Sequence, residues 1–213
     1  MLIGLTGMYC AGKNHIAALL ERRGFPVLDV DILGHIAIEN KKADIIARFG
    51  EDMVSPDGSI NRRLLGAKVF GKKTELAALE AIVHPEANRL TLEWVAAHGA
   101  AHHDTAYQDT ARHGAICVIN AALLHKSAVF TMLDCIIMVS APWFIRLMRA
   151  RRRDKLPWAA IIGRLLSQRK FIAQYSTGNA DIYTVKNPGI EWKSLESRIN
   201  TILSKIGSGN TTV

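Results

Sequence analysis

Five apolar runs, each joined to the next by residues with helical or turn spacing, set the pattern of this 213-residue chain. The runs predicted to be strands cover residues 2–5, 26–31, 115–120, 133–141 and 181–187. Parallel strands need crossover connections, which are usually helices, so the alternation predicts an α/β fold with a parallel sheet wrapped on both faces. The run at 133–141 is continuously apolar, as expected of a strand covered on both sides.

The first apolar run enters a loop, and a helical pattern follows from Lys13 to a stop at Gly24. This loop fits G-x-x-x-x-G-K, in which backbone N–H groups surround a phosphate and the helix directs its positive end at the anion. The alternative is a glycine-rich structural turn, which the strand before the loop and the helix after it disfavour. The residues predicted to hold nucleotide phosphates are Gly7, Met8, Tyr9, Cys10, Ala11, Gly12, Lys13, Asn14 and His15.

Asn14 stands where this motif normally has a Ser or Thr whose hydroxyl reaches Mg²⁺. An amide oxygen can accept a metal or a metal-bound water, though less compactly than a hydroxyl. Asn14 is therefore the predicted metal contact, and phosphate binding is the firmer prediction of the two.

The second apolar run ends in Asp29 and Asp31. Residues two apart in a strand share a face, so both carboxylates are expected to project together at the carboxyl end of a strand, where α/β sheets bind ligands. Asp31 is the candidate base that takes a proton from an attacking hydroxyl. The alternative for Asp29 is a cap for the helix starting near Ile32.

Helical spacing is predicted from Ile32 to Phe49, and again from Glu75 to about His98 with a break or kink at Pro85. His35 follows Asp31 by one helical turn, which puts the two on one face; a structural role is the alternative. Between these helices, a turn at residues 55–58 precedes a basic helix start at Asn61-Arg62-Arg63.

Composition narrows the class of protein. The net charge is +8 with only 7% aromatic residues, and no nucleic-acid module is present, which favours phosphate-bearing metabolites over nucleic acid. No segment is long enough to span a membrane and no signal peptide is evident, so a cytoplasmic location is expected. Cys10, Cys117 and Cys135 are expected to be reduced thiols, because their number is odd and their spacing wide.

Several motifs in this order resemble the dephospho-coenzyme A kinases, which use ATP to phosphorylate the ribose 3′-hydroxyl of dephospho-CoA. The resemblance spans nearly the whole chain, and the most particular match is DGSINRRLL followed by VF and then HP. The matching segments are GLTGMYCAGK at 4–13, LDVD with His35, residues 49–70, LEAIVHP at 79–85, Ala122-Leu123-Leu124, residues 134–139, Arg146, Gln168 and ADIYTVKNPG at 180–189.

This resemblance implies a phosphate-loop NTPase fold with three α/β/α layers and a five-stranded parallel sheet. It adds a helical substrate-binding insert at about 33–98 and a helical lid at about 143–172. No repeat or linker divides the chain, so residues 1–207 are expected to form a single kinase domain, and the composition of residues 208–213 predicts a disordered tail. ATP and Mg²⁺ are the expected cofactors, and dephospho-CoA is the expected substrate. The implied catalytic residues are Asp31, Lys13 and Arg146; the implied substrate contacts are Asp31, His35, Arg62, His84 and Leu123; and Asn187 is placed near the adenine.

The basic run Arg146 to Arg153 has two interpretations, a solvated helix face or a lid that closes over ATP. The phosphate loop favours a lid, although which arginine reaches the phosphates stays open. The His-rich stretch 98–113 contains His102, His103 and His113, but without a fixed ligand spacing an exposed segment is favoured over a metal site.

The chain departs from the family pattern at Met8, Cys10 and Asn14 in the loop, and at Asn120 and Lys126 after the third strand. Two alternatives therefore stand beside a dephospho-CoA kinase. One is another small-metabolite or nucleoside monophosphate kinase, and the other is a catalytically weakened relative that binds nucleotide or CoA. Retention of Lys13, Asp31 and the arginines favours activity in a monomer or weak homo-oligomer.

Overall fold

The computed structural model describes residues 1–100, 116–168, 171–175, 180–189 and 192–207 of the chain. It contains two compact units. The sheet unit comprises Met1–Leu28 and Val95–Val213, and the helical unit comprises Asp29–Trp94. The predicted tail and most of the His-rich stretch lie outside the described residues.

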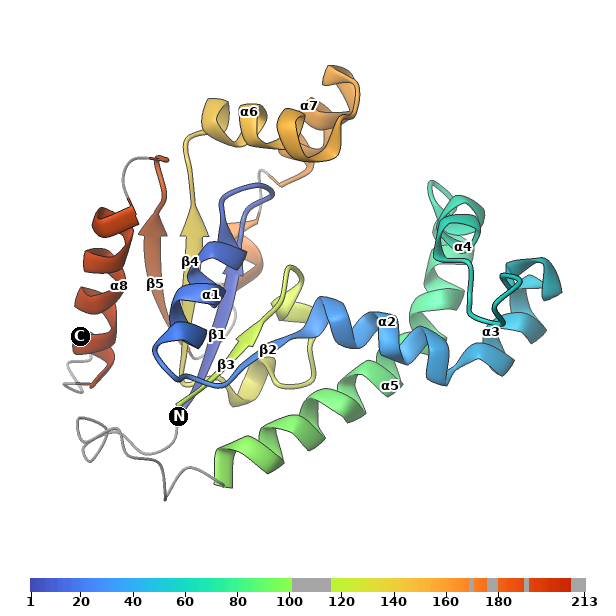
Figure 1. The fold of residues 1–213 in the computed structure, drawn as a ribbon, viewed down its shortest axis with the longest axis horizontal. Coiled ribbons are helices and arrows are strands. Elements are labelled where there is room, and N and C mark those ends of the chain that lie inside the picture. The colour runs from blue at the N-terminus through green and yellow to red at the C-terminus, as the bar shows by residue number, and fades with distance from the viewer. Residues whose placement is uncertain (101–115, 169–170, 176–179, 190–191, 208–213) are drawn as a thin grey trace. The chain divides into compact units, whose positions relative to one another are not determined.

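The sheet unit is built on five strands in the order β2-β3-β1-β4-β5 (Figure 1). The strands are β1 (Leu2–Gly7), β2 (Val27–Asp29), β3 (Cys117–Asn120), β4 (Cys135–Ser140) and β5 (Asp181–Lys186). β1 pairs in parallel with β3 and β4, and β4 pairs in parallel with β5, which confirms the predicted parallel α/β sheet. β1 is central, so all six of its residues are buried.

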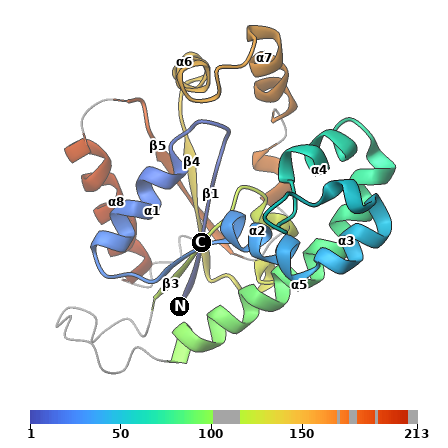
Figure 2. The ribbon, with the colours of Figure 1, turned by 45° about the vertical axis from the view of Figure 1, so that its right-hand side comes forward.

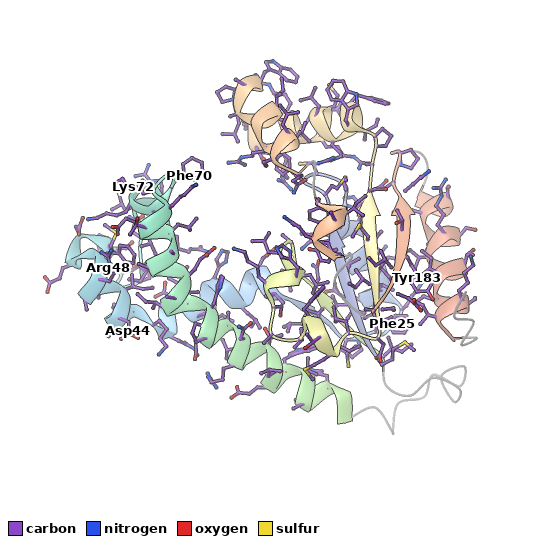
Figure 3. All side chains as sticks on the ribbon, turned by 180° about the vertical axis from the view of Figure 1, so that it is seen from behind. Phe25, Asp44, Arg48, Phe70, Lys72 and Tyr183 are labelled. Carbon is purple, nitrogen blue, oxygen red and sulfur yellow. The ribbon has the colours of Figure 1, made fainter. Side chains whose placement is uncertain are left out.

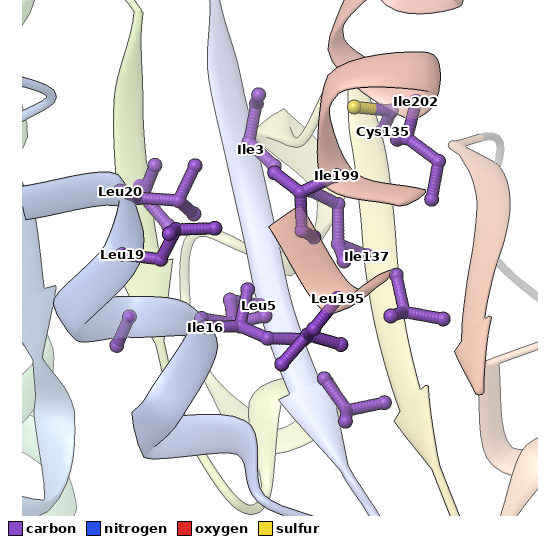
Figure 4. Close-up of a cluster of buried hydrophobic side chains, with 14 of the residues drawn as sticks. Ile3, Leu5, Ile16, Leu19, Leu20, Cys135, Ile137, Leu195, Ile199 and Ile202 are labelled. Carbon is purple, nitrogen blue, oxygen red and sulfur yellow. The ribbon is translucent and has the colours of Figure 1, made fainter. Parts of the chain in front are cut away.

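One face of this sheet is covered by α1 (Lys13–Arg22) and α8 (Trp192–Gly207), which lie side by side in Figures 1 and 2. The alternating side chains Ile3 and Leu5 of β1 contact this layer, as strand geometry requires. Full burial of an Ile or Leu side chain stabilises a fold by roughly 1.5–3 kcal/mol. The cluster drawn in Figure 4 includes Ile16, Leu19 and Leu20 of α1, Ile137 of β4, and Leu195 and Ile199 of α8.

The other face of β1 carries Gly4 and Thr6. A Cβ at Gly4 would come within 2.5 Å of the Leu124 side chain, so glycine is needed for this leucine to pack directly on the strand. Thr6 Oγ1 lies 3.1 Å from the hydroxyl of buried Tyr175. These partners come from short 3₁₀ turns, η3 (Leu124–Lys126) and η5 (Ile172–Tyr175); a third, η4, spans Phe130–Met132.

After β4 the chain forms two helices, α6 (Trp143–Asp154) and α7 (Trp158–Ser167), which pack on one another. We refer to them as the α6–α7 hairpin. One face of α6 carries buried Arg146 and Ala150. Trp143 and Phe144, in the first turn of the helix, are exposed. The predicted solvated basic face is therefore only part of α6, because Arg146 is just 6% exposed.

The helical unit contains α2 (Val30–Asn40), α3 (Lys42–Phe49), η1 (Glu51–Met53), α4 (Arg62–Val69) and most of α5 (Lys73–Ala100). Its own core comprises Ala37, Ile45, Phe49, Met53, Ile60, Leu65, Val69 and Val83. On its surface, Arg48 of α3 pairs with Glu75 of α5 at 3.0 Å, and Phe70 after α4 is 80% exposed (Figure 3 labels Arg48 and Phe70).

Two sequence expectations about this unit change, and a third is confirmed. The helix predicted from Ile32 to Phe49 is two helices, because α2 ends at Asn40 and α3 begins at Lys42. Pro85 does not break α5, which runs through it. The basic helix predicted at Asn61-Arg62-Arg63 is confirmed, with the Asn61 side chain accepting a hydrogen bond from the Leu64 N–H at 3.1 Å as an N-cap.

Candidate active site

The loop from Gly7 to Lys13 connects the central strand to α1 and is shaped by its two glycines. A Cβ at Gly7 would lie 2.9 Å from Val139 of the neighbouring strand. Gly12 has φ 98°, and a Cβ there would lie 2.3 Å from the Asn187 amide nitrogen. Gly12 is the N-cap of α1, whose first turn contains no acidic residue. The loop therefore leads into a helix N-terminus suited to an anion.

Cys10 occupies the left-handed region with φ 57°, where glycine would be unstrained. This conformation costs an L-residue about 1–2 kcal/mol. The Met8 side chain, in contrast, packs against the main core, and its Sδ lies 3.2 Å from the Arg146 guanidinium. The two departures from loop glycines thus have different consequences, since only the one at Cys10 carries backbone strain.

The loop carbonyls are bound by side chains from distant segments. Arg146 Nε donates to the Tyr9 carbonyl at 2.9 Å, and Arg149 Nη1 donates to the Ala11 carbonyl at 3.1 Å. Asn187, buried beyond the end of β5, donates from Nδ2 to the same Ala11 oxygen at 2.9 Å. Its Oδ1 in turn accepts from Arg149 Nη2 at 3.2 Å. Three side chains therefore hold one side of the loop.

These contacts determine where the loop amides point. The described backbone has no cis peptide, and in a trans peptide the N–H lies opposite the preceding C=O. The Tyr9 and Ala11 carbonyls face Arg146 and Arg149, so the N–H groups of Cys10 and Gly12 point away from these guanidiniums. Arg146 and Arg149 thus lie on the carbonyl side of the loop, and amide donors are left for an anion on the other side.

Asp31 is not in a strand, contrary to the prediction from the sequence. β2 ends at Asp29 and α2 begins at Val30, which puts Asp31 in the first helical turn. Asp29 is the N-cap, and its Oδ1 accepts from the Asp31 N–H at 3.0 Å. The capping role for Asp29, left open in the sequence, is therefore confirmed. Asp31 and His35 are four residues apart on α2, both with exposed side chains.

The remaining predicted contacts differ in exposure. Arg62 opens α4 and is exposed, whereas His84 on α5 is half-buried. Leu123, just before η3, is 53% exposed, although the neighbouring Leu124 is fully buried. In the first turn of α1, Asn14 and His15 are exposed and Lys13 is half-buried. Of the contacts predicted in the helical unit, Asp31, His35 and Arg62 are thus exposed and His84 is half-buried.

The departures after β3 also differ in environment. Asn120 is buried at the end of the strand, whereas Lys126 is exposed. Burial raises the pKa of the Cys135 thiol to about 12, and it also raises the pKa values of Cys117 and Cys10, the latter against the opposing effect of Arg153. All three cysteines are free thiols, as predicted. Within the described ranges, no group of three or more His, Cys, Asp or Glu side chains is arranged to hold a metal.

Sequence reasoning missed the individual role of Arg149. It appeared only as one of five arginines in a basic run, yet it contacts the loop and Asn187 together. The helical period gives the signal that identifies it: Arg146, Arg149 and Arg153 recur at spacings of three and four, which marks one face of α6.

A central parallel strand, a glycine-bounded loop and a helix N-terminus with amides directed outward define a phosphate-loop nucleotide-binding fold. The family model for dephospho-CoA kinases matches residues 1–187. The chain belongs to the dephospho-CoA kinase family, and its activity is the ATP-dependent phosphorylation of dephospho-CoA. No helix among the described residues is long and apolar enough to cross a membrane.

Relatives agree with this assignment, and solved structures share the fold. The dephospho-CoA kinase of Anaeromyxobacter dehalogenans is 33% identical over 98% of this chain and 93% of its own length. The dephospho-CoA kinase of Treponema pallidum is 30% identical over 97% of this chain and 95% of its own length. A Thermus thermophilus crystal structure, TT1252, has a TM-score of 0.74 at 29% identity, covering 96% of this chain and 97% of its own. Campylobacter jejuni dephospho-CoA kinase shares the fold, with a TM-score of 0.67 at 20% identity, over 99% and 98%.

Proposed function

We propose that residues Gly7 to His15 hold the β- and γ-phosphates of ATP and that Asp31 activates the ribose 3′-hydroxyl of dephospho-CoA. The observation that carries the first part is the set of loop carbonyls bound by Arg146, Arg149 and Asn187, which directs amides to the opposite side. Lys13 supplies a positive charge at the first position of α1. Phosphoryl transfer requires mainly such positioning and charge stabilisation.

Asp31 is the proposed base because it lies two residues beyond the end of β2, and α/β enzymes bind ligands at the carboxyl ends of strands. A carboxylate accepts the hydroxyl proton while the oxygen attacks the γ-phosphorus and the bond to the ADP oxygen breaks. Asp29 is less suited to this role, since its Oδ1 already accepts the hydrogen bond that caps α2. His35, one turn further along the helix, orients the acceptor hydroxyl or its ribose.

Arg146 acts through the loop in this proposal. Its guanidinium is buried and bonded to the Tyr9 carbonyl and Gln168, on the opposite side from the outward amides. Burial lowers the pKa of Arg146 from its ordinary value, yet arginine stays protonated at any physiological pH. Arg146 and Arg149 therefore shape the loop, and Asn187 joins this network beside the site proposed for the adenine.

Mg²⁺ is the proposed metal, and Asn14 is its proposed protein contact. The Asn14 side chain is exposed in the first turn of α1, and its amide oxygen suits a hard cation or a metal-bound water. When bound, Mg²⁺ neutralises charge on the β- and γ-phosphates. Asn14 supplies one oxygen, so most of the coordination falls to phosphates and water, as is usual for Mg²⁺.

The proposed dephospho-CoA contacts are His35, Arg62 and His84 of the helical unit and Leu123 of the sheet unit. Arg62 is suited to a phosphate because its guanidinium is exposed at the start of α4. In this account residues 1–207 form one kinase with the helical unit as its substrate insert. The protein works as a monomer or weak homo-oligomer in the cytoplasm.

The test is CoA formation by the purified chain with ATP and Mg²⁺. Dephospho-CoA should be phosphorylated far faster than AMP or shikimate, and excess chelator should abolish turnover. Preference for either of the other acceptors would contradict the proposed substrate contacts. Binding of ATP and dephospho-CoA without turnover would mean that the changes at Asn14 and Asn120 have removed catalysis.

A further inference from the structure

The Tyr9 side chain connects the phosphate loop to the α6–α7 hairpin. Its hydroxyl donates a hydrogen bond to Asp154 Oδ2, at the last residue of α6. Its ring is flanked by two guanidiniums, with Arg153 at 5.3 Å and Arg164 of α7 at 5.8 Å from the ring centroid. One loop side chain therefore contacts both helices of the hairpin.

Asp154 joins these groups by charge. Its Oδ1 accepts from Arg153 Nε at 2.7 Å, and its Oδ2 lies 3.6 Å from Arg164 Nη1. Hydrogen bonding to Arg153 lowers the pKa of Asp154, whereas burial and then Asp154 itself raise the pKa of Tyr9. The lowered pKa of Asp154 and the raised pKa of Tyr9 both favour a carboxylate acceptor and a phenol donor near neutral pH.

The Tyr9 backbone is bound to the same hairpin at a second point. Its N–H donates to Gln168 Oε1 at 2.6 Å, and its carbonyl accepts from Arg146 Nε at 2.9 Å. Arg146 Nη2 also donates to Gln168 Oε1 at 2.8 Å. Gln168 is the C-cap of α7, so contacts from both helices converge on this one loop residue.

We propose that Tyr9 is a positioning residue that holds the α6–α7 hairpin on the phosphate loop before ATP binds. The proposal rests on the proposed phosphate-binding role of the loop. A hairpin that is already held keeps Arg149 on the Ala11 carbonyl in the nucleotide-free protein. ATP binding then needs less ordering of the hairpin, and preorganisation of this kind increases affinity.

The experiment compares Tyr9→Phe, Asp154→Asn and the double variant with the unmodified protein. Hydrogen exchange of peptides from residues 143–167 is recorded without nucleotide, and calorimetry gives the Kd for ATP. Each single variant should exchange faster in the hairpin and bind ATP about three- to tenfold more weakly, less than the full effect of losing a hydrogen bond to a charged group, because this contact acts on ATP only through the hairpin. The KM for ATP should change more than kcat.

The double variant should be no worse than Asp154→Asn alone, because both changes act on the same hydrogen bond, whereas Asp154→Asn also weakens the contacts of Asp154 with Arg153 and Arg164. Tyr183→Phe on β5 (labelled in Figure 3) and Asp181→Asn at the start of that strand are matched controls, expected to behave like the unmodified protein. Tyr9→Phe retains the ring beside Arg153 and Arg164, so it should lose less affinity than Tyr9→Leu.

Unchanged exchange in the single variants, additive effects in the double variant, or a fall in kcat with unchanged ATP affinity would each overturn the role of Tyr9. A separate result addresses the phosphate loop itself. If the unmodified protein bound no ATP while its hairpin exchange still depended on Tyr9, the phosphate-binding proposal would fail and the contact between Tyr9 and the hairpin would stand.

Discussion

The sheet unit and the helical unit differ in the sequence separation of the contacts that stabilise each of them internally. In the sheet unit, Arg146 reaches Tyr9 across 137 residues, and Asn187 reaches Ala11 across 176. In the helical unit, the bond from the Asn40 amide to Glu86 spans 46 residues, and Arg89 binds Glu86 from three residues away. The phosphate loop is therefore shaped by remote segments, whereas the helical unit is specified by its own neighbourhood.

This difference teaches which kind of site each unit provides. The loop is rigidly defined, with its glycines against Val139 and Asn187 and its carbonyls bonded. The helical unit buries a small core and leaves Asp31, His35 and Arg62 exposed. Under the proposed function, these exposed side chains would form the acceptor site around the bound molecule.

Gly12→Ala should cause the largest loss of activity, and the structural change should be confined to the sheet unit. The added methyl would meet the Asn187 amide nitrogen at 2.3 Å, in a backbone with φ 98°. We expect kcat/KM for ATP to fall about a hundredfold or more, since misplacing a binding loop by about 1 Å can cost this much. Steady-state kinetics with varied ATP measures it.

Gly24→Ala is the matched control for that change. Gly24 also has a positive φ, 82°, but a Cβ there would meet nothing within 4 Å. It should lose about 1–2 kcal/mol of stability through strain and retain near-normal kcat/KM. Equal losses of activity in the two variants would contradict the role given to the contact between Gly12 and Asn187.

Acidification below about pH 4.5 should destabilise the helical unit through protonation of Glu86. Bonds from Arg89 and then Asn40 lower the Glu86 pKa from its ordinary value of 4.5 to about 2. The unfolded chain therefore binds the proton at higher pH than the folded chain. The stabilisation is fully present above about pH 4.5 and is lost as the pH falls toward 2.

Hydrogen exchange of α5 peptides between pH 6 and pH 2.5, corrected for intrinsic rates, measures this effect. Glu86→Gln should already be less protected at pH 6 and should lose less further protection on acidification. Glu93→Gln, at an exposed partner of the same Arg89, is the control and should keep most of the acid dependence. An acid response in Glu86→Gln equal to that of the unmodified protein would contradict the assignment.

Cys10→Gly should have the smallest effect, and it should stabilise the fold where the other changes destabilise it or reduce activity. Glycine relieves the left-handed strain at φ 57°, but it also gives the unfolded chain more freedom. We expect a net stabilisation of up to about 1 kcal/mol. Thermal melts monitored by circular dichroism measure it, with Cys10→Ala, which keeps the strain, as the comparison. Greater stabilisation by alanine than by glycine would contradict the strain at this position.

Much of the sheet unit could be predicted from the sequence because its elements are locally encoded. Apolar runs gave the five strands, and the glycines with Lys13 gave the loop before α1. The Asn61 cap and the basic start of α4 were also predictable, since the signal lies within four residues. These features depend on periodicity and capping, which a single sequence contains.

The features that the sequence did not predict depend on tertiary contacts or on competition between strand and helix in one short segment. The strand order and the pairing of Arg149 with Asn187 join segments far apart in sequence. Asp31 was misplaced because alternating apolar and acidic residues resemble a strand. The Asp29 side chain, by accepting the Asp31 N–H, begins the helix two residues earlier than expected.

The central claim is that the sheet unit binds ATP while Asp31 of the helical unit activates the acceptor, and Asp31→Asn tests it most directly. CoA formation with saturating ATP and Mg²⁺ should fall at least about a hundredfold, as expected for a positioned base. The Kd for ATP should stay close to that of the unmodified protein, because the loop is shaped within the other unit. Turnover retained within a few fold would contradict the account.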